Sequence, residues 1–65
     1  MDEKQERINH LVRLTNPLVS IVYGTLKATV FVSYNEVSLS LIETINTIGQ
    51  LLKELGYSDV FVKFS

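Results

Sequence analysis

Phe31 and Phe61 interrupt two segments in which apolar and polar residues otherwise alternate. Such alternation is typical of β-strands, because successive side chains of a strand point to opposite faces of the sheet. The apolar phase of each segment predicts one buried face, and the two phenylalanines then fall on the opposite face. The sequence therefore predicts a sheet with apolar groups on both faces, and the second face needs a cover.

Residues 18–23 and 26–34 are rich in β-branched and aromatic residues and predict two strands. Gly24-Thr25 between them fits a two-residue type II′ hairpin turn. That turn would place Tyr23 opposite Leu26, Ile21 opposite Ala28 and Val19 opposite Val30. Residues 60–64 predict a third strand, with Val60, Val62 and Phe64 on one face and Phe61 and Lys63 on the other.

Two further segments have helical periodicity. Residues 2–15 predict a short amphipathic helix, with Asp2 as N-cap and Asn16-Pro17 as its stop. Residues 41–55 predict a longer helix, begun either by Asn35 or by a capping box of Ser40 and Glu43, and ended by Gly56. Gly49 borders its apolar stripe and is interpreted as allowing the helix to approach the sheet closely.

The element order is therefore α-β-β-α-β, in one small α+β domain that covers residues 1–65. The first strand is apolar on both sides, which favours a central position. We expect a three-stranded antiparallel sheet of order 2-1-3, with the long helix on one face and the short N-terminal helix on or near the other. The predicted inner core is Val19, Ile21, Leu26, Val30, Val32, Leu41, Ile45, Ile48, Leu52, Val60 and Val62.

The chain offers little to stabilise so small a domain apart from its core. A domain of 65 residues buries only ~60% of the surface that its unfolded chain exposes. There is no cysteine, and His10 is the single histidine, which excludes disulfides and a Cys/His metal site. With 46% hydrophobic residues, the composition favours oligomerisation as the stabilising device.

The sequence predicts no catalytic, cofactor or metal site. His10 lacks a cysteine or carboxylate partner, and no serine lies in a Gly-x-Ser-x-Gly elbow. The three glycines are far apart, so there is no phosphate-binding loop. We therefore expect a non-enzymatic protein without a cofactor.

The charge and hydropathy of the chain limit the classes of partner that it is expected to bind. The net charge is −1 and both signs are spread along the chain, which disfavours nucleic acid. The apolar runs are far shorter than the ~20 residues of a membrane span, and the N-terminus does not resemble an export signal. A cytoplasmic location is the default expectation.

Four residues on the second sheet face form the candidate interface: Leu18, Val22, Phe31 and Phe61. In one interpretation the N-terminal helix covers them, with Ile8, Leu11 and Val12 as an intramolecular lid. In the other, this face or the helix itself contacts another chain, since exposed apolar patches mark interfaces. Pairing through the strand edges of a dimer is a further route.

The predicted function is a protein–protein interaction module, a small adaptor, inhibitor or regulator that self-associates as a homodimer or binds another protein. One alternative comes from residues 29–34 and the helix ending Leu-Gly-Tyr-Ser, which are similar to the start of the ribbon-helix-helix fold of DNA-binding regulators. Two features oppose it, because residues 60–64 suit a strand and the strand carries only Lys27 for a DNA groove. Another alternative is a small subunit that completes a ligand site between protomers.

Overall fold

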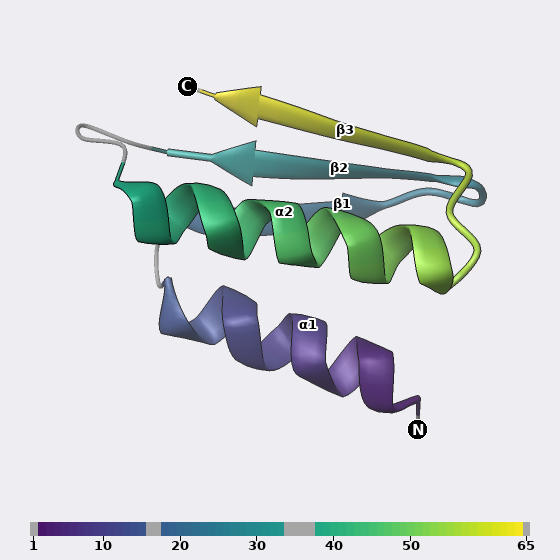
Figure 1. The fold of residues 1–65 in the computed structure, drawn as a ribbon. Helices are drawn as coiled ribbons and strands as arrows, with labels where there is room; N and C mark the ends of the chain where they lie inside the picture. The colour runs from purple at the N-terminus through teal and green to yellow at the C-terminus, as the bar shows by residue number, and fades with distance from the viewer. Residues whose placement is uncertain (1, 16–17, 34–37, 65) are drawn as a thin grey trace.

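A computed structural model describes residues 2–15, 18–33 and 38–64 of the chain. The predicted element order α-β-β-α-β is confirmed. The elements are α1 (Glu3–Leu14), β1 (Val19–Tyr23), β2 (Lys27–Val32), α2 (Leu39–Glu54) and β3 (Asp59–Phe64). The chain is thus an α+β domain with two helices and a three-stranded sheet (Figure 1).

The sheet is mixed, and its strand order is β1-β2-β3. The predicted order 2-1-3 and the all-antiparallel sheet are therefore wrong. β1 pairs antiparallel with β2, whereas β3 runs parallel to β2. Because α2 carries the chain back along the sheet, β3 starts at the same end as β2 and pairs directly with it, in a β-α-β unit. The central strand is β2, and β1 and β3 are the two edges.

The β1–β2 hairpin is offset by two residues from the predicted pairing. Ile21 lies opposite Val30, and Tyr23 lies opposite Ala28. The Gly24 N–H donates to the Lys27 carbonyl at 2.6 Å, which moves the tip of the hairpin to residues 25–26. Gly24 lacks the positive φ that a type II′ turn requires at its first central position, so that prediction was wrong. Because the offset is an even number of residues, every side chain keeps its predicted face.

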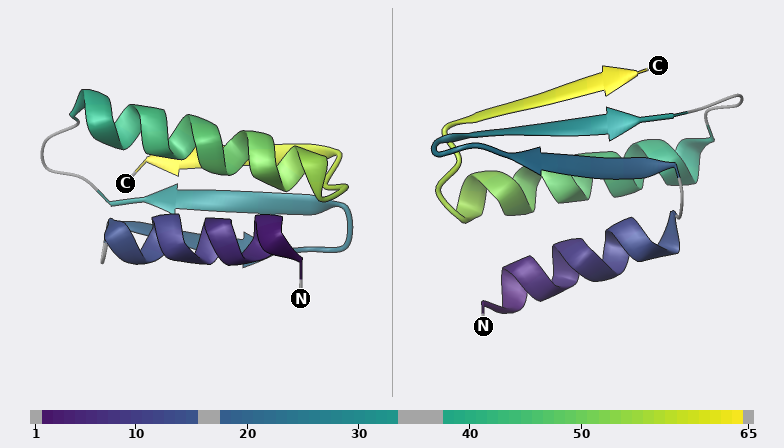
Figure 2. Two further views of the ribbon diagram at one scale, coloured as in Figure 1. Left: turned by 60° about the horizontal axis from the view of Figure 1, so that its bottom comes forward. Right: turned by 180° about the vertical axis from the view of Figure 1, so that it is seen from behind.

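Both helices lie side by side on one face of the sheet (Figures 1 and 2). The prediction that the N-terminal helix lies on or near the other face was wrong. Ile8 of α1 is fully buried in the same core as Ile48 and Leu52 of α2 and Val30 of β2. The molecule therefore has two layers, and the opposite face of the sheet is not covered by either helix.

The helix ends follow standard capping chemistry. The Asp2 side chain accepts a hydrogen bond from the Lys4 N–H at 2.7 Å, which confirms the predicted N-cap of α1. The N-cap of α2 is Ser38, whose hydroxyl oxygen accepts from the Leu41 N–H at 3.1 Å, and not Ser40. Asn35, Asn16 and Pro17 lie outside the described residues.

Gly56 confirms the predicted end of α2. Its φ of +108° is the left-handed conformation that favours glycine after a helix. The Gly56 N–H donates to the Lys53 carbonyl and the Tyr57 N–H donates to the Leu52 carbonyl, the pair of bonds of a Schellman motif. This turn reverses the direction of the chain between the end of α2 and the start of β3.

Seven predicted core residues are buried: Val19, Val30, Val32, Leu41, Ile45, Ile48 and Leu52. Ile21 and Val60 are half-buried at the border of the core. Leu26 is exposed because it lies at the tip of the hairpin, and Val62 is exposed because β3 is an edge strand. The interpretation of Gly49 was also wrong, because a Cβ placed there would meet no atom within 4 Å.

The similarity to the ribbon-helix-helix fold ends after α2. That fold requires a second helix, and Asp59–Phe64 instead form β3. Residues 2–15, 18–33 and 38–64 therefore do not have the ribbon-helix-helix architecture.

Candidate interaction surface

The face of the sheet turned away from the helices, here called the open face, is built from alternate residues of the three strands (Figure 2). One cross-strand row contains Val22, Thr29 and Phe61. The next row contains Ser20, Phe31 and Lys63. Phe31 is two residues from Thr29 in β2, so it lies diagonal to both Val22 and Phe61 and within reach of them.

The four predicted interface residues of the sheet are exposed together on this side. The exposed fraction of the side chain is 38% for Leu18, 59% for Val22, 37% for Phe31 and 48% for Phe61. Leu18 comes just before β1, where its carbonyl accepts from the Ser33 N–H at 2.8 Å. Its predicted position opposite Phe31 is taken by Ser20, because of the offset of the hairpin. Phe31 and Leu18 are diagonal neighbours instead.

The other three predicted interface residues lie in the helix layer. Ile8 is fully buried, and Leu11 and Val12 pack against the core. They belong to the covered face of the sheet, so they do not form a lid over Phe31 and Phe61. The structure thus brings together Leu18, Val22, Phe31 and Phe61 and separates them from Ile8, Leu11 and Val12.

Charged groups border the apolar residues of the open face. Asp59 lies opposite Lys27 at the hairpin end of the sheet, and Lys63 lies opposite Phe31. All three charged residues are exposed. The open face therefore has an apolar centre with charges at its rim, an arrangement that is typical of protein–protein interfaces.

The edge strand β3 carries exposed apolar groups on both of its faces. On the side of the helices, 39% of Val62 and 50% of Phe64 are exposed. On the open face, 48% of Phe61 is exposed. Sequence reasoning missed Val62 as a surface residue because alternation identifies the face of a strand and not its position in the sheet.

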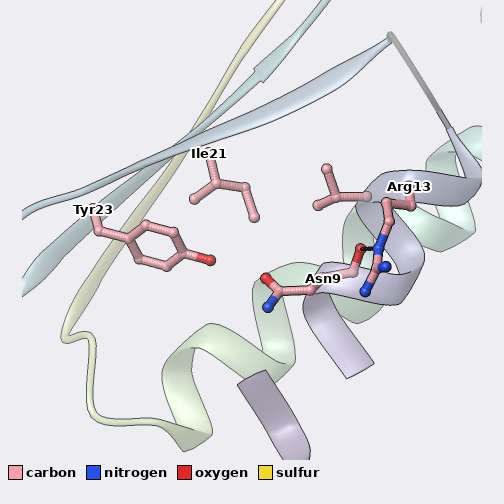
Figure 3. A pocket seen from close by; sticks show the side chains of 5 residues that line it. Asn9, Arg13, Ile21 and Tyr23 are labelled. Carbon is pink, nitrogen blue, oxygen red and sulfur yellow. Dashed lines mark hydrogen bonds between the residues drawn. The ribbon is translucent and has the colours of Figure 1, made fainter. Parts of the chain in front are cut away.

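A groove of about 420 Å³ lies between α1 and β1, which is the edge strand on the other side of the sheet from β3 (Figure 3). It is lined by Asn9, Val12, Arg13, Ile21 and Tyr23. The Arg13 Nε donates to the Asn9 carbonyl at 3.4 Å, and Gln5 donates to the Tyr23 hydroxyl at 3.0 Å. These bonds engage the Arg13 Nε and the Tyr23 hydroxyl, and the lining of the groove contains no histidine or carboxylate for proton transfer.

The described residues contain no cluster of three or more His, Asp or Glu side chains that could hold a metal ion. His10 is exposed on α1. Within residues 2–15, 18–33 and 38–64, neither helix has the length and apolarity needed to cross a membrane. The most distinctive surface of the described chain is therefore the open face together with β3.

Comparison with protein-family models, with curated proteins and with solved structures gave no significant match. Any conclusion about function therefore rests on the residues of the chain itself.

Proposed function

We propose that the protein is a non-enzymatic protein–protein interaction module, a small cytoplasmic adaptor, inhibitor or regulator that self-associates through the open face or an edge strand of its sheet. The observation that supports the proposal is the open face itself. Val22, Phe31 and Phe61 lie together there, and neither helix covers them.

The free energy available from covering the open face is large relative to the stability of so small a domain. Complete burial of a valine, leucine or phenylalanine side chain contributes about 1.5–3 kcal/mol. The total stability of a folded domain is only about 5–15 kcal/mol, and a 65-residue chain lies at the low end. Covering even two half-exposed side chains by a partner would add a sizeable fraction of that stability.

Another protein is the second candidate partner, because the apolar centre and charged rim of the open face do not depend on a copy of the same chain. Nucleic acid is not proposed. The three basic and acidic groups of the open face have mixed sign, whereas a phosphate backbone requires a positive surface.

The test is the solution mass across a hundredfold dilution, measured by light scattering on the native chain and on Phe61→Asp. We expect a dimer that dissociates on dilution for the native chain, and a folded monomer for Phe61→Asp, because the substitution places a carboxylate in the apolar patch without reaching the core. His10→Asp is the matched control, since it introduces the same side chain at an exposed position of α1.

Two results would overturn the proposal. One is a native chain that stays monomeric at every concentration. The other is a Phe61→Asp variant that has the circular dichroism spectrum of the native chain and associates with unchanged affinity.

A further inference from the structure

We infer that two copies of the chain pair along β3, antiparallel and in one register, with the twofold axis at Phe61. The inference rests on the proposed self-association and specifies its geometry. It joins two three-stranded sheets into one sheet of six strands, with all four helices on the same face.

The pairing of β3 with β2 determines which backbone groups of β3 point away from the sheet. The Asp59 N–H donates to the Leu26 carbonyl at 3.1 Å, so the backbone of Asp59 points toward β2. Backbone direction alternates along a strand, so Phe61 and Lys63 also point toward β2. Val60 and Val62 then direct their N–H and C=O groups to the outer edge, where the described chain has no further strand.

A register centred on Phe61 uses these outward groups. It places Val60 opposite Val62 of the second copy, and Val62 opposite Val60 of the second copy. Both are hydrogen-bonded pairs of an antiparallel ladder, and each exchanges two N–H to C=O bonds. Phe61 then faces Phe61 of the second copy in a non-hydrogen-bonded pair, where side chains approach most closely.

The same register makes the charges complementary. Asp59 and Lys63 are each two residues from Phe61, and both lie on the open face. Antiparallel pairing about Phe61 therefore places Asp59 opposite Lys63 of the second copy at one end, and Lys63 opposite Asp59 at the other. Opposite charges in directly opposed positions stabilise a sheet, and like charges destabilise it.

The helix side of β3 also has room for a second copy. A groove of about 340 Å³ runs between β3 and α2, and Val60, Val62 and Gly49 contribute to its lining. Because α2 packs over both β2 and β3, pairing would place two α2 helices about two strand spacings apart, roughly 10 Å, within the packing range of helices. The open space beside Gly49 lies in this groove.

The other edge of the sheet lacks these features. β1 has the sequence Val-Ser-Ile-Val-Tyr and contains no charged residue, so no register along it pairs opposite charges. The α1 helix lies along that side of the sheet (Figure 2). The second copy is therefore assigned to β3.

The test exchanges the two charges. Asp59→Lys alone places two lysines opposite each other at both ends of the interface, and Lys63→Asp alone places two carboxylates there. We expect each single variant to dimerise about tenfold more weakly than the native chain, and the loss to shrink at high salt. The double variant Asp59→Lys/Lys63→Asp should recover the native affinity.

An equimolar mixture of the two single variants sharpens the test, because their heterodimer has opposite charges at both ends. Native mass spectrometry should show the heterodimer well in excess of its statistical proportion. A mixture of Glu6→Lys and Arg7→Asp is the matched control, since these exposed residues of α1 receive the same changes of charge away from β3. The control mixture should give homodimers and heterodimers in statistical proportion.

A cysteine at the twofold axis reports the register directly. The chain contains no cysteine, and residues in a non-hydrogen-bonded antiparallel pair have Cα atoms about 4.5 Å apart, within the range of a disulfide. Phe61→Cys should oxidise to a covalent dimer, whereas Val22→Cys, at the other side of the open face, should form no covalent dimer under the same oxidant.

The outcomes separate this inference from the proposed function. A native chain that never dimerises overturns both. A native dimer that is insensitive to the charge exchange, or that is captured by Val22→Cys and not by Phe61→Cys, overturns the β3 register and leaves self-association standing.

Discussion

The two faces of the sheet are made by alternate residues of the same three strands, yet they have opposite environments. In β2, Ala28, Val30 and Val32 are fully buried beneath the helices, whereas Phe31 between them is more than one-third exposed on the open face. A step of one residue thus separates side chains that hold the domain together from side chains that are available to a partner. Stability and recognition therefore depend mainly on different side chains, and substitutions on neighbouring residues test this separation.

The largest expected contrast is between Val30→Asp and Phe31→Asp. A carboxylate at Val30 would be buried without a partner, which costs about 4 kcal/mol or more and exceeds what a small domain can lose. We expect Val30→Asp to be unfolded by circular dichroism, and Phe31→Asp to keep the native spectrum at concentrations where the chain is monomeric. Equal loss of structure in both variants would mean that the open face is covered within the monomer.

An intermediate contrast is between Leu52→Ala and Phe61→Ala. Leu52 is fully buried, so its truncation should lower the free energy of unfolding by about 2–5 kcal/mol. Phe61 is 48% exposed, so its truncation should cost the monomer about half of the usual 3–5 kcal/mol of a buried phenylalanine. Urea unfolding of the monomer measures both values. A larger loss for Phe61→Ala than for Leu52→Ala would contradict the assignment of the core.

The smallest expected effect concerns the border between the covered face and the free edge of β3. At Gly49 a methyl group would meet no atom within 4 Å, so Gly49→Ala should stabilise the monomer by about 0.5–1 kcal/mol through helix propensity. Thermal unfolding of the monomer measures the shift. Gly56→Ala is the matched control and should destabilise instead, because of the positive φ at that position. A lower melting temperature for Gly49→Ala would show that this flank is packed.

Local patterns predicted the elements, the N-cap of α1, the C-terminal glycine of α2 and the face of each strand residue. They failed on strand order. Apolar residues on both sides of β1 were interpreted as the mark of a central strand, but Val22 is apolar because it belongs to the open face. The alternation of apolar and polar residues indicates which face of the sheet a side chain occupies. It does not indicate which strands are neighbours in the sheet.

The candidate surface was predictable for a related reason. Phe31 and Phe61 are out of phase with the buried residues, and that signal survives any error in strand order. The contribution of Val62 was not predictable, because its exposure follows from the edge position of β3 and from the width that α2 can cover. A surface formed at a strand edge depends on contacts between distant segments, which single-residue patterns do not encode.

The parallel pairing of β2 with β3 also affects how the domain assembles. The β1–β2 hairpin joins neighbours in sequence, whereas the bond from the Ser58 hydroxyl to the Leu26 carbonyl joins residues 32 positions apart. Closing that longer loop costs more chain entropy than closing the hairpin. We therefore expect the hairpin to form first during folding, and the attachment of β3 to complete the sheet.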